Sequence, residues 1–397
     1  MSVILVVNSG SSSIKYQIID PATEERLAKG LIERVGTDRG RVIHTGPDGE
    51  TREAERPVLD HVAGFEAMLH ACARYGPDLD EVPIVAVGHR VVQGGSRFVQ
   101  PTPITDAVMA TIEELSPLAP LHNPPNLLGI RAARATFPNL PHVAVFDTAF
   151  HRTLPPEAYT YAIDANLAAE YRIRRYGFHG TSHTYVSERA AALLGRPLGQ
   201  VNSIVLHIGN GVSACAVRGG ESIDTSMGMT PLEGLVMGTR SGDIDPGILF
   251  HLHRQDDMTV SQMDDLLNRR SGLLGLAGSS DMRDVLASAA RGEPRAELAV
   301  DVYCHRLRHY VGAYYAQLGR LDAIAFTAGV GENAPEIRAR SLAGLESMGI
   351  VIDPERNAAP GDDGRISPDD SAVAVLVIPT NEELEIARQT MRTVESM

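Results

Sequence analysis

The sequence is short of several residue types, and each shortage argues against a class of protein. Its three cysteines, Cys72, Cys215 and Cys304, lie far apart with no C-x-x-C pair. This argues against a disulfide framework or a zinc site and favours a reducing compartment, the cytoplasm. No apolar run reaches the roughly 18 residues of a membrane-spanning helix, and no signal peptide is recognisable at the start. A net charge of −14 argues against a general binder of nucleic acid or anionic membranes.

Length and composition instead indicate a globular protein of two domains. The 397 residues exceed one average domain, and 43% hydrophobic with 22% charged residues is ordinary for a globular chain. Pro155 and Pro156 lie shortly after a predicted strand that ends at Phe146, so the domain boundary is expected there. Residues 354–370 are rich in Pro, Asp and Gly and predict a surface loop.

Short Val- and Ile-rich runs alternate with longer segments of helical pattern, which predicts an α/β fold. Asn123 is a predicted helix cap before Pro124, and Thr380 has capping-box spacing to Glu383. Strands are predicted at 3–7, 14–19, 83–87, 142–146, 203–208, 212–217, 322–327 and 373–378. Helices are predicted at 61–75, 104–115, 124–137, 183–194, 259–268, 297–318, 334–347 and 381–394.

The first two predicted strands flank a polar loop, Asn8 to Ser13, that is followed by Lys15. Gly10 allows the backbone to approach a ligand, and successive amides can bind an anion. Of 36 basic residues only Lys15 and Lys29 are lysines, so a lysine at this loop favours a phosphate site. The alternative is an ordinary Ser/Gly hairpin turn.

A similar strand–turn–strand pattern recurs about half a chain later. Residues 203–208 and 212–217 flank Gly209, Asn210 and Gly211, and Ser213 follows the turn. Two hairpins that each open one half of the chain suggest duplication of a whole domain.

Two arginines and an aspartate lie where charge could be used in chemistry. Arg90 follows a predicted strand and precedes a glycine turn, where it could bind a carboxylate or phosphate or form a surface ion pair. Asp147 follows a buried strand, where it could position a metal or a nucleophile or cap a turn. Arg240 lies between glycines in a loop and could stabilise a transferring phosphoryl group.

Other polar residues have competing interpretations. His122 at a helix entrance is either structural or phosphate-facing. His179 and His183 have the four-residue spacing of metal ligands on a helix, but the neighbouring glycines favour an anion-binding loop with Ser182 as a helix cap. Residues 327–333 follow a strand and open a helix, without a complete dinucleotide or P-loop motif. Glu382 has no capping role and could face a metal.

Together these segments closely resemble the acetate kinase family, within the superfamily of actin-like ATPases and sugar kinases. The resemblance covers essentially the whole chain, in family order. Its two signatures correspond to Asn8–Lys15 and Arg175–His183. Further matching segments are 89–95, 119–126, 146–151, 207–211, 238–243, 329–333 and 380–383.

The resemblance implies two duplicated ribonuclease H-like, actin-like domains around a nucleotide cleft. The domains would be 1–150, completed by the C-terminal helix 381–397, and 151–380. It implies a homodimer and the reaction of ATP with acetate to give ADP and acetyl phosphate, with Mg²⁺, for which Mn²⁺ could substitute.

The family's functional residues transfer by motif. The resemblance implies catalytic roles for Asp147, His179 and Arg240, and magnesium ligation by Asn8 and Glu382. Acetate would be bound by Arg90, Val92, Leu121, His122, Phe178 and Pro231. ATP would be contacted by Ser11, Ser13, Lys15, His207, Ile208, Gly209, Asn210, Gly211, Asp281, Met282, Arg283, Gly329, Val330, Gly331, Glu332 and Asn333. Gln93 departs from the histidine expected in many relatives and lies next to the pocket in sequence, so it bears on substrate preference.

Physical chemistry constrains these roles. A carboxylic acid with a pKa of about 4.3 is already ionised at neutral pH, so acetate needs no general base. Asp147 therefore more plausibly organises Mg²⁺, water or an arginine. Bringing an anion to a polyanion requires charge neutralisation. We expect direct in-line transfer; a phosphoenzyme on a carboxylate is the competing route, and stereochemistry at phosphorus distinguishes them. The rival functions are a propionate or butyrate kinase and a non-catalytic nucleotide-dependent clamp.

Overall fold

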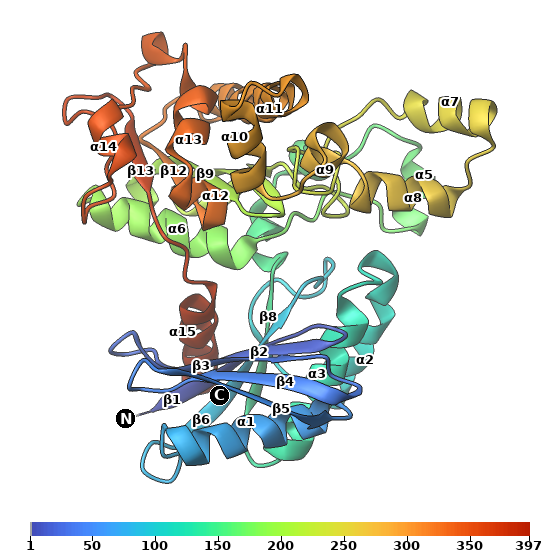
Figure 1. Ribbon diagram of the computed structural model, residues 1–397, viewed down its shortest axis with the longest axis vertical. Coiled ribbons are helices and arrows are strands. Elements are labelled where there is room, and N and C mark those ends of the chain that lie inside the picture. The colour runs from blue at the N-terminus through green and yellow to red at the C-terminus, as the bar shows by residue number, and fades with distance from the viewer. Residues whose placement is uncertain (1) are drawn as a thin grey trace. The chain divides into compact units, whose positions relative to one another are not determined.

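The computed structural model describes residues 2–397, which form two compact units. Within the described chain, unit 1 comprises residues 2–150 and 381–397, and unit 2 comprises residues 151–380. Each unit is built on one mixed β-sheet (Figure 1). No helix in residues 2–397 is long and apolar enough to cross a membrane.

Unit 1 contains an eight-stranded sheet in the order β5-β4-β3-β2-β1-β6-β8-β7. The long hairpin strands β1 to β5 are antiparallel, whereas β6 and β8 run parallel to β1. The strands are β1 (Val3–Ser9), β2 (Ser13–Asp20), β3 (Glu25–Glu33), β4 (Thr37–Thr45), β5 (Thr51–Val58), β6 (Ile84–Val91), β7 (Thr102–Pro103) and β8 (His142–Phe146).

Helices cover the two faces of this sheet unequally. On one face α1 (His61–Tyr75) and α3 (Asn123–Thr136) enclose a core that includes Ile14 and Phe65. Because side chains alternate along a strand, Lys15 next to Ile14 points to the other face. There α15 (Glu382–Glu395) packs over Gly88 of β6, leaving part of the face open. Helix α2 (Asp106–Glu114) packs beside α3.

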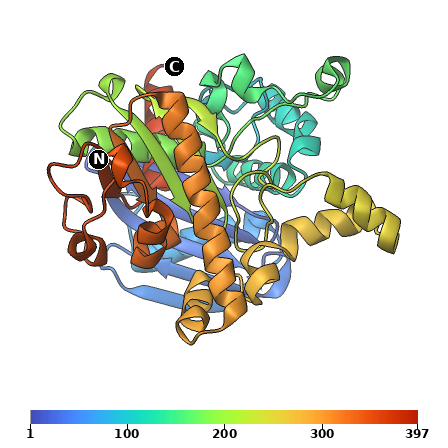
Figure 2. The ribbon, with the colours of Figure 1, turned by 90° about the horizontal axis from the view of Figure 1, so that it is seen from above.

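Unit 2 contains a five-stranded sheet in the order β11-β10-β9-β12-β13. Its strands are β9 (Asn202–Ile208), β10 (Val212–Arg218), β11 (Glu221–Thr225), β12 (Ala323–Thr327) and β13 (Ala374–Val377). Helices α6 (Gly180–Leu193) and α11 (Pro294–Leu318) pack against this sheet, and Figure 2 shows α11 crossing it. The remaining helices are α4 (Pro156–Tyr159), α5 (Ala165–Glu170), α7 (Gly247–Asp256), α8 (Val260–Arg269), α9 (Gly272–Ala277), α10 (Met282–Ala290), α12 (Ala328–Asn333), α13 (Pro335–Leu342) and α14 (Pro354–Ala358).

The two sheets share one strand order. In unit 1 it is β3-β2-β1-β6-β8, and in unit 2 it is β11-β10-β9-β12-β13, with three antiparallel strands followed by two parallel ones in both. Each echoed hairpin therefore provides two adjacent interior strands of its own sheet. The predicted α/β class with duplicated domains of the actin-like kind is confirmed.

All eight predicted strands are present, but several local details differ. Strands β3, β4, β5, β7 and β11 were not predicted. Strand β5 is mostly exposed and carries charged side chains, and β7 has only two residues, so neither has the apolar pattern of a buried strand. Arg90 lies inside β6 rather than after it. Helix α13 ends at Leu342, five residues before its predicted end. Residues 354–358 form a short helix inside the predicted loop.

Three predicted helix caps are wrong. The Asn123 side chain is inside α3 and accepts the amide of Gln93, because the tertiary partner competes for the same oxygen. Helix α15 is capped by Asn381 instead of Thr380. Ser182 lies within α6, where its hydroxyl contacts the ring of His207.

Buried neutral histidines predict a loss of stability in acid. Burial lowers the pKa of His44, His89, His142, His151 and His183, and that of His151 falls to about 4. The unfolded chain, with a histidine pKa of about 6.5, then binds more protons, so stability present above pH 6.5 is lost as the pH falls towards 4.

For His151 alone the loss between pH 7.5 and 5 is about 2 kcal/mol by linkage. Denaturant unfolding should therefore show a smaller pH-dependent loss in His151→Gln than in the wild type, by about that amount. The exposed control His70→Gln should keep the wild-type loss. An equal loss in all three proteins would contradict the assignment.

Candidate functional site

In unit 1 an arginine and an aspartate meet at the ends of adjacent parallel strands. Arg90 of β6 donates from Nε to Oδ1 of Asp147 at 3.0 Å and from Nη2 to Oδ2 at 2.7 Å. Asp147 follows β8 and is 1% exposed. Burial disfavours the Arg90 charge, but Asp147 and Glu382 outweigh it and raise the pKa of Arg90. The Nη1 of Arg90 has no hydrogen-bond or ion-pair partner in residues 2–397.

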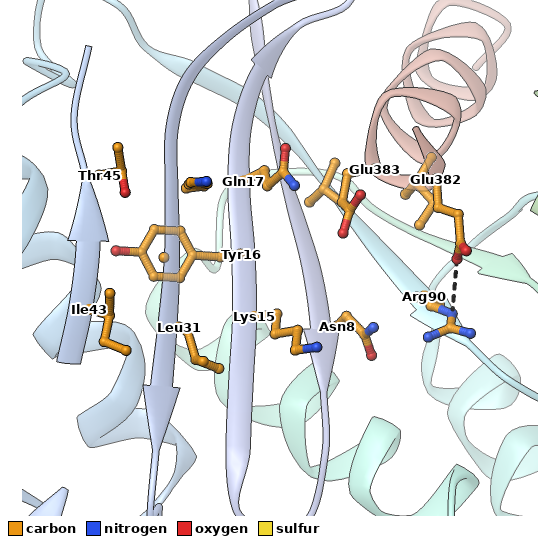
Figure 3. A pocket seen from close by; sticks show the side chains of 14 residues that line it. Asn8, Lys15, Tyr16, Gln17, Leu31, Ile43, Thr45, Arg90, Glu382 and Glu383 are labelled. Atoms are coloured by element: carbon orange, nitrogen blue, oxygen red, sulfur yellow. Dashed lines mark ion pairs between the residues drawn. The ribbon is translucent and has the colours of Figure 1, made fainter. Parts of the chain in front are cut away.

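Arg90 borders a cavity on the sheet face beside α15. Asn8, Lys15, Arg90 and Glu382 all line it (Figure 3). Asn8 and Lys15 are direct partners across β1 and β2, so their side chains lie next to each other. Oε2 of Glu382 lies 4.0 Å from Nε of Arg90. The cavity continues over Lys29, so both lysines of the chain line it.

Glu382 holds its proton more tightly than an ordinary glutamate. Burial, together with the negative charges of Asp147 and Glu383, raises its pKa to about 7, although Arg90 and Lys15 act in the opposite direction. A cation beside this carboxylate would favour its ionised form.

The loop between β1 and β2 is shorter than predicted. Only Gly10, Ser11 and Ser12 form the turn, which is closed by the Gly10 amide bonding to the Ser13 carbonyl at 2.8 Å. Ser11 is exposed and Ser13 begins β2. Asn126, whose role the sequence did not predict, donates to the Ser9 carbonyl at 2.9 Å and accepts the Val92 amide at 3.1 Å.

The predicted acetate residues of unit 1 differ in exposure. Val92 is 8% exposed, whereas Leu121 is 63% exposed. His122 occupies the N-cap position of α3. Gln93 is fully buried: its Oε1 accepts the Gly95 amide at 2.9 Å, and its Nε2 has no hydrogen-bond partner in the described chain. Gln93 therefore supports the backbone turn after β6.

In unit 2 one hydroxyl links two histidines of the second signature. Oγ of Ser213 lies 2.9 Å from Nδ1 of His179 and 2.8 Å from Nε2 of His183. His183 is fully buried, and no group of three His, Cys, Asp or Glu residues in positions 2–397 could hold a metal. Both imidazoles are instead engaged by the Ser213 hydroxyl. The sequence indicated only that Ser213 follows the turn, and it did not predict that its hydroxyl contacts both histidines.

His179 is held in an unusual backbone conformation directly before α6. Its φ of 55° is left-handed, which is costly for a residue other than glycine. Its ring stacks on that of His207 with centroids 4.1 Å apart, and Nδ1 of His207 contacts Oγ of Ser182 at 2.8 Å. These contacts hold the His179 imidazole at the start of the helix.

Arg240 lies close to the same histidine. A Cβ atom on Gly211 would be 3.4 Å from Nη1 of Arg240 and 3.5 Å from Cε1 of His179, so the three residues converge. Arg240 donates to the Pro231 carbonyl at 3.4 Å and forms no ion pair with the residues described. Burial lowers its pKa. Phe178 is 2% exposed, so its ring is inside unit 2.

The predicted nucleotide loops of unit 2 also adjoin one another. The Gly238 amide donates to the Asn210 carbonyl at 3.0 Å, and a Cβ on Gly238 would meet Asn210 and the Ser280 carbonyl. Asp281 caps α10 and pairs with Arg283 at 2.5 Å. A Cβ on Gly209 would lie 3.8 Å from that of Ala328, next to residues 329–333. Thus 207–211, 281–283 and 329–333 belong to one region.

A buried arginine without a sequence signal supports this region. Arg338 is 1% exposed and donates to the carbonyls of Gly331 and Glu332, both at 2.9 Å. It also bonds Asn357. Burial lowers its pKa to about 10. Its bonds to backbone carbonyls fix the short helix α12, and no pattern of charges in the sequence indicates them.

The raised pKa of Glu382 predicts that this carboxylate destabilises the ligand-free protein at high pH. The folded state binds the extra proton between about pH 4.5 and 7, so the stability contributed by the protonated form is lost as the pH rises through 7. Glu382→Gln removes this ionisation, so the substitution should be more favourable to the folded state at pH 8 than at pH 5. The difference between its effects on the free energy of unfolding at the two pH values should be up to about 3 kcal/mol.

Denaturant titrations without divalent cations check this difference. The control is Glu395→Gln at the exposed end of α15, which should show no such pH dependence. The same pH dependence in both variants would refute the shift at Glu382.

The chain is similar in sequence and in structure to known kinases. An acetate kinase of Clavibacter michiganensis is 65% identical, with 98% of this chain and 99% of that protein covered. One of Leifsonia xyli is 64% identical, with 99% of each covered. The crystal structure of Porphyromonas gingivalis acetate kinase matches with a TM-score of 0.95 and 42% identity over 99% of this chain and all of that one.

The crystal structure of a propionate kinase from Francisella tularensis is similarly alike, with a TM-score of 0.92 and 42% identity over 99% of this chain and all of that one. The model of the Acetokinase family matches residues 3–388. The chain therefore belongs to the acetokinase family.

Proposed function

We propose that the protein transfers the γ-phosphoryl group of ATP to acetate, giving acetyl phosphate and ADP, and catalyses the reverse reaction. Membership of the acetokinase family makes it a kinase. The observation that supports the acceptor is Arg90, which Asp147 holds by two bonds while its Nη1 has no protein partner. A guanidinium so fixed suits a carboxylate substrate.

In unit 1 the acceptor needs a positive charge rather than a base. Acetate, with a pKa of about 4.3 or slightly above, is already a nucleophilic anion at neutral pH. Asp147 is committed to Arg90, so we assign it the orientation of that arginine and no proton transfer. Val92, Leu121 and His122 would line the acceptor side of unit 1.

In unit 2 the same logic applies to the phosphoryl group. Arg240 has no carboxylate partner in residues 2–397, and burial lowers its pKa, so a ligand anion would offset the cost of keeping it charged. His179 and Arg240 would stabilise the charge that develops on the phosphoryl group during transfer. The transfer itself would be direct and in line. ATP would lie against residues 207–211, 281–283 and 329–333. The resemblance to the family separately assigns phosphate contacts to Ser11, Ser13 and Lys15.

Asn8 and Glu382 are suited to Mg²⁺. An amide and a carboxylate line one cavity and supply the oxygen ligands that Mg²⁺ prefers, with phosphate and water oxygens to complete an octahedron. The ion would neutralise phosphate charge, and Mn²⁺ could substitute for it. By resemblance to the family we further propose a homodimer, and three free, buried cysteines suit a reducing compartment, the cytoplasm.

The second candidate is a kinase of propionate or butyrate, supported by the similar structure of a propionate kinase. A methylene group changes binding in an apolar pocket by only about 1–3 kcal/mol, so some activity on propionate is expected in either case.

Hydroxylamine trapping of acyl phosphate tests the function. We expect ATP-dependent hydroxamate from acetate, less from propionate and butyrate, and none when EDTA removes the divalent cation. A product strongest with a longer acid would replace acetate by that acid. No product with any acid, from folded protein that binds ATP, would refute the proposal.

Substitutions of the two arginines should affect different kinetic constants. Arg90→Ala should raise the KM for acetate at least tenfold, because it removes the carboxylate partner. Arg240→Ala should lower kcat roughly 10³-fold, the scale of an arginine that acts on a transferring phosphoryl group. The control Arg340→Ala removes surface ion pairs with Asp301 of α11 and Glu336 of α13 and should change neither constant. Near-wild-type kcat in Arg240→Ala would contradict its role.

A further inference from the structure

We propose that Glu233, fixed by Arg175 and Tyr161, is a positioning residue that sets which acyl chain lengths the enzyme accepts. The proposal rests on the proposed function, because it concerns the acceptor acid. Glu233 would act through Pro231, two residues earlier, which is expected to line the pocket for the methyl group. Nothing in the sequence distinguishes Glu233 from an ordinary surface carboxylate.

Both carboxylate oxygens of Glu233 have a specific partner. Oε1 accepts from Nη2 of Arg175 at 2.6 Å. Oε2 accepts a short hydrogen bond from the hydroxyl of Tyr161, which in turn accepts the Met229 amide at 2.9 Å. Burial and Glu233 raise the pKa of Tyr161, so the phenol stays protonated and donates. Glu233 is therefore held at two points.

Arg175 ties this carboxylate to the start of the same segment. Its Nη1 donates to the carbonyls of Thr225, Ser226 and Met227 at 2.9, 3.2 and 3.2 Å. Its side chain is 17% exposed, and burial, which disfavours its charge, is outweighed by Glu233 and the neighbouring negative groups, which raise its pKa. One guanidinium thus connects Glu233 to the backbone before the turn.

Glycine at position 228 is required by this packing. A Cβ there would lie 1.7 Å from Oε2 of Glu233 and 2.2 Å from the Tyr161 oxygen. The Gly228 carbonyl accepts the amides of Tyr176 and Gly177 at 3.1 and 3.2 Å. The turn that precedes Pro231 is consequently packed directly against the side chains that hold Glu233.

The far end of the segment has its own anchor. The Gly234 amide donates to Asp243 at 2.8 Å, and Asp243 also accepts from Arg306 and Tyr310 of α11 at 2.5 and 2.7 Å. Pro231 lies between the two anchors, and its carbonyl accepts from Arg240. A shift of residues 229–233 would therefore move both the pocket wall and the carbonyl beside Arg240.

The preference for acetate over longer acids is sensitive to such a shift, because the free-energy difference between binding these acids is small. Rejection of one methylene group in an apolar pocket is worth only about 10- to 200-fold. A wall that moves outward by a fraction of an ångström accepts a longer chain without losing the charged contacts that bind the carboxylate. Loosening Glu233 should thus change the ratio of substrates more than it changes the turnover of acetate.

The test compares Glu233→Gln and Tyr161→Phe with the wild type by kcat/KM for acetate, propionate and butyrate. We expect both variants to lower the acetate-to-propionate ratio about threefold to tenfold, chiefly through KM. The control Asp301→Asn removes another arginine–carboxylate pair of 2.6 Å in unit 2, and its ratio should stay at the wild-type value. If Glu233→Gln does not fold, Tyr161→Phe, which retains the Arg175 pair, carries the test.

Amide hydrogen exchange gives a readout independent of activity. Exchange of Met229 and the adjacent amides should be faster in both variants and unchanged in Asp301→Asn. Unchanged exchange, or faster exchange with an unchanged acetate-to-propionate ratio, would overturn the proposal. A wild-type protein that phosphorylates no acid would refute the proposed function, and the selectivity role with it.

Discussion

The bidentate pair between Arg90 and Asp147 is the interaction on which the chemistry proposed for unit 1 depends. The buried carboxylate of Asp147 fixes the guanidinium of Arg90 in place and favours its charged form, but it also offsets part of the positive potential that a ligand anion would meet. The pair occupies Nε and Nη2 and leaves Nη1, so orientation and binding use different donors. Glu382 at 4.0 Å adds a second negative charge, which explains why this cavity is suited to a cation as well as to an anion.

In unit 2 the side chain next to Arg240 is held in place by neutral groups rather than by a carboxylate. Hydroxyls and imidazoles, such as Ser213 between His179 and His183, hold the histidine that lies beside Arg240. No carboxylate in residues 2–397 pairs with Arg240, so a bound anion would be the partner that compensates its positive charge. The supporting histidines are buried, and the left-handed backbone at His179 stores strain. The same features that fix the site thus reduce stability in acid, which is the exchange of stability for function expected at active sites.

The duplicated hairpins show how one architecture accommodates two roles. In each sheet the hairpin supplies two adjacent interior strands, and its turn lies near polar groups. The turn of unit 1 is followed by Lys15 and adjoins Asn8, whereas that of unit 2 consists of Gly209, Asn210 and Gly211 and leaves space beside Arg240. The difference suits a charged phosphate contact in one unit and close backbone approach of a nucleotide in the other.

The sequence by itself determined the α/β class, the central strands, the echoed hairpins and the motif residues, because apolar periodicity and glycine-rich turns are local signals. It did not determine the partners of those residues. Asn123 and Ser182 have the chemistry of helix caps, but tertiary contacts take their polar atoms. Arg338 and Glu233 resemble surface charges until folding buries one among carbonyls and pairs the other with Arg175 and Tyr161. Hydrogen bonds between residues far apart in the chain depend on which segments pack together, and only the tertiary structure decides that.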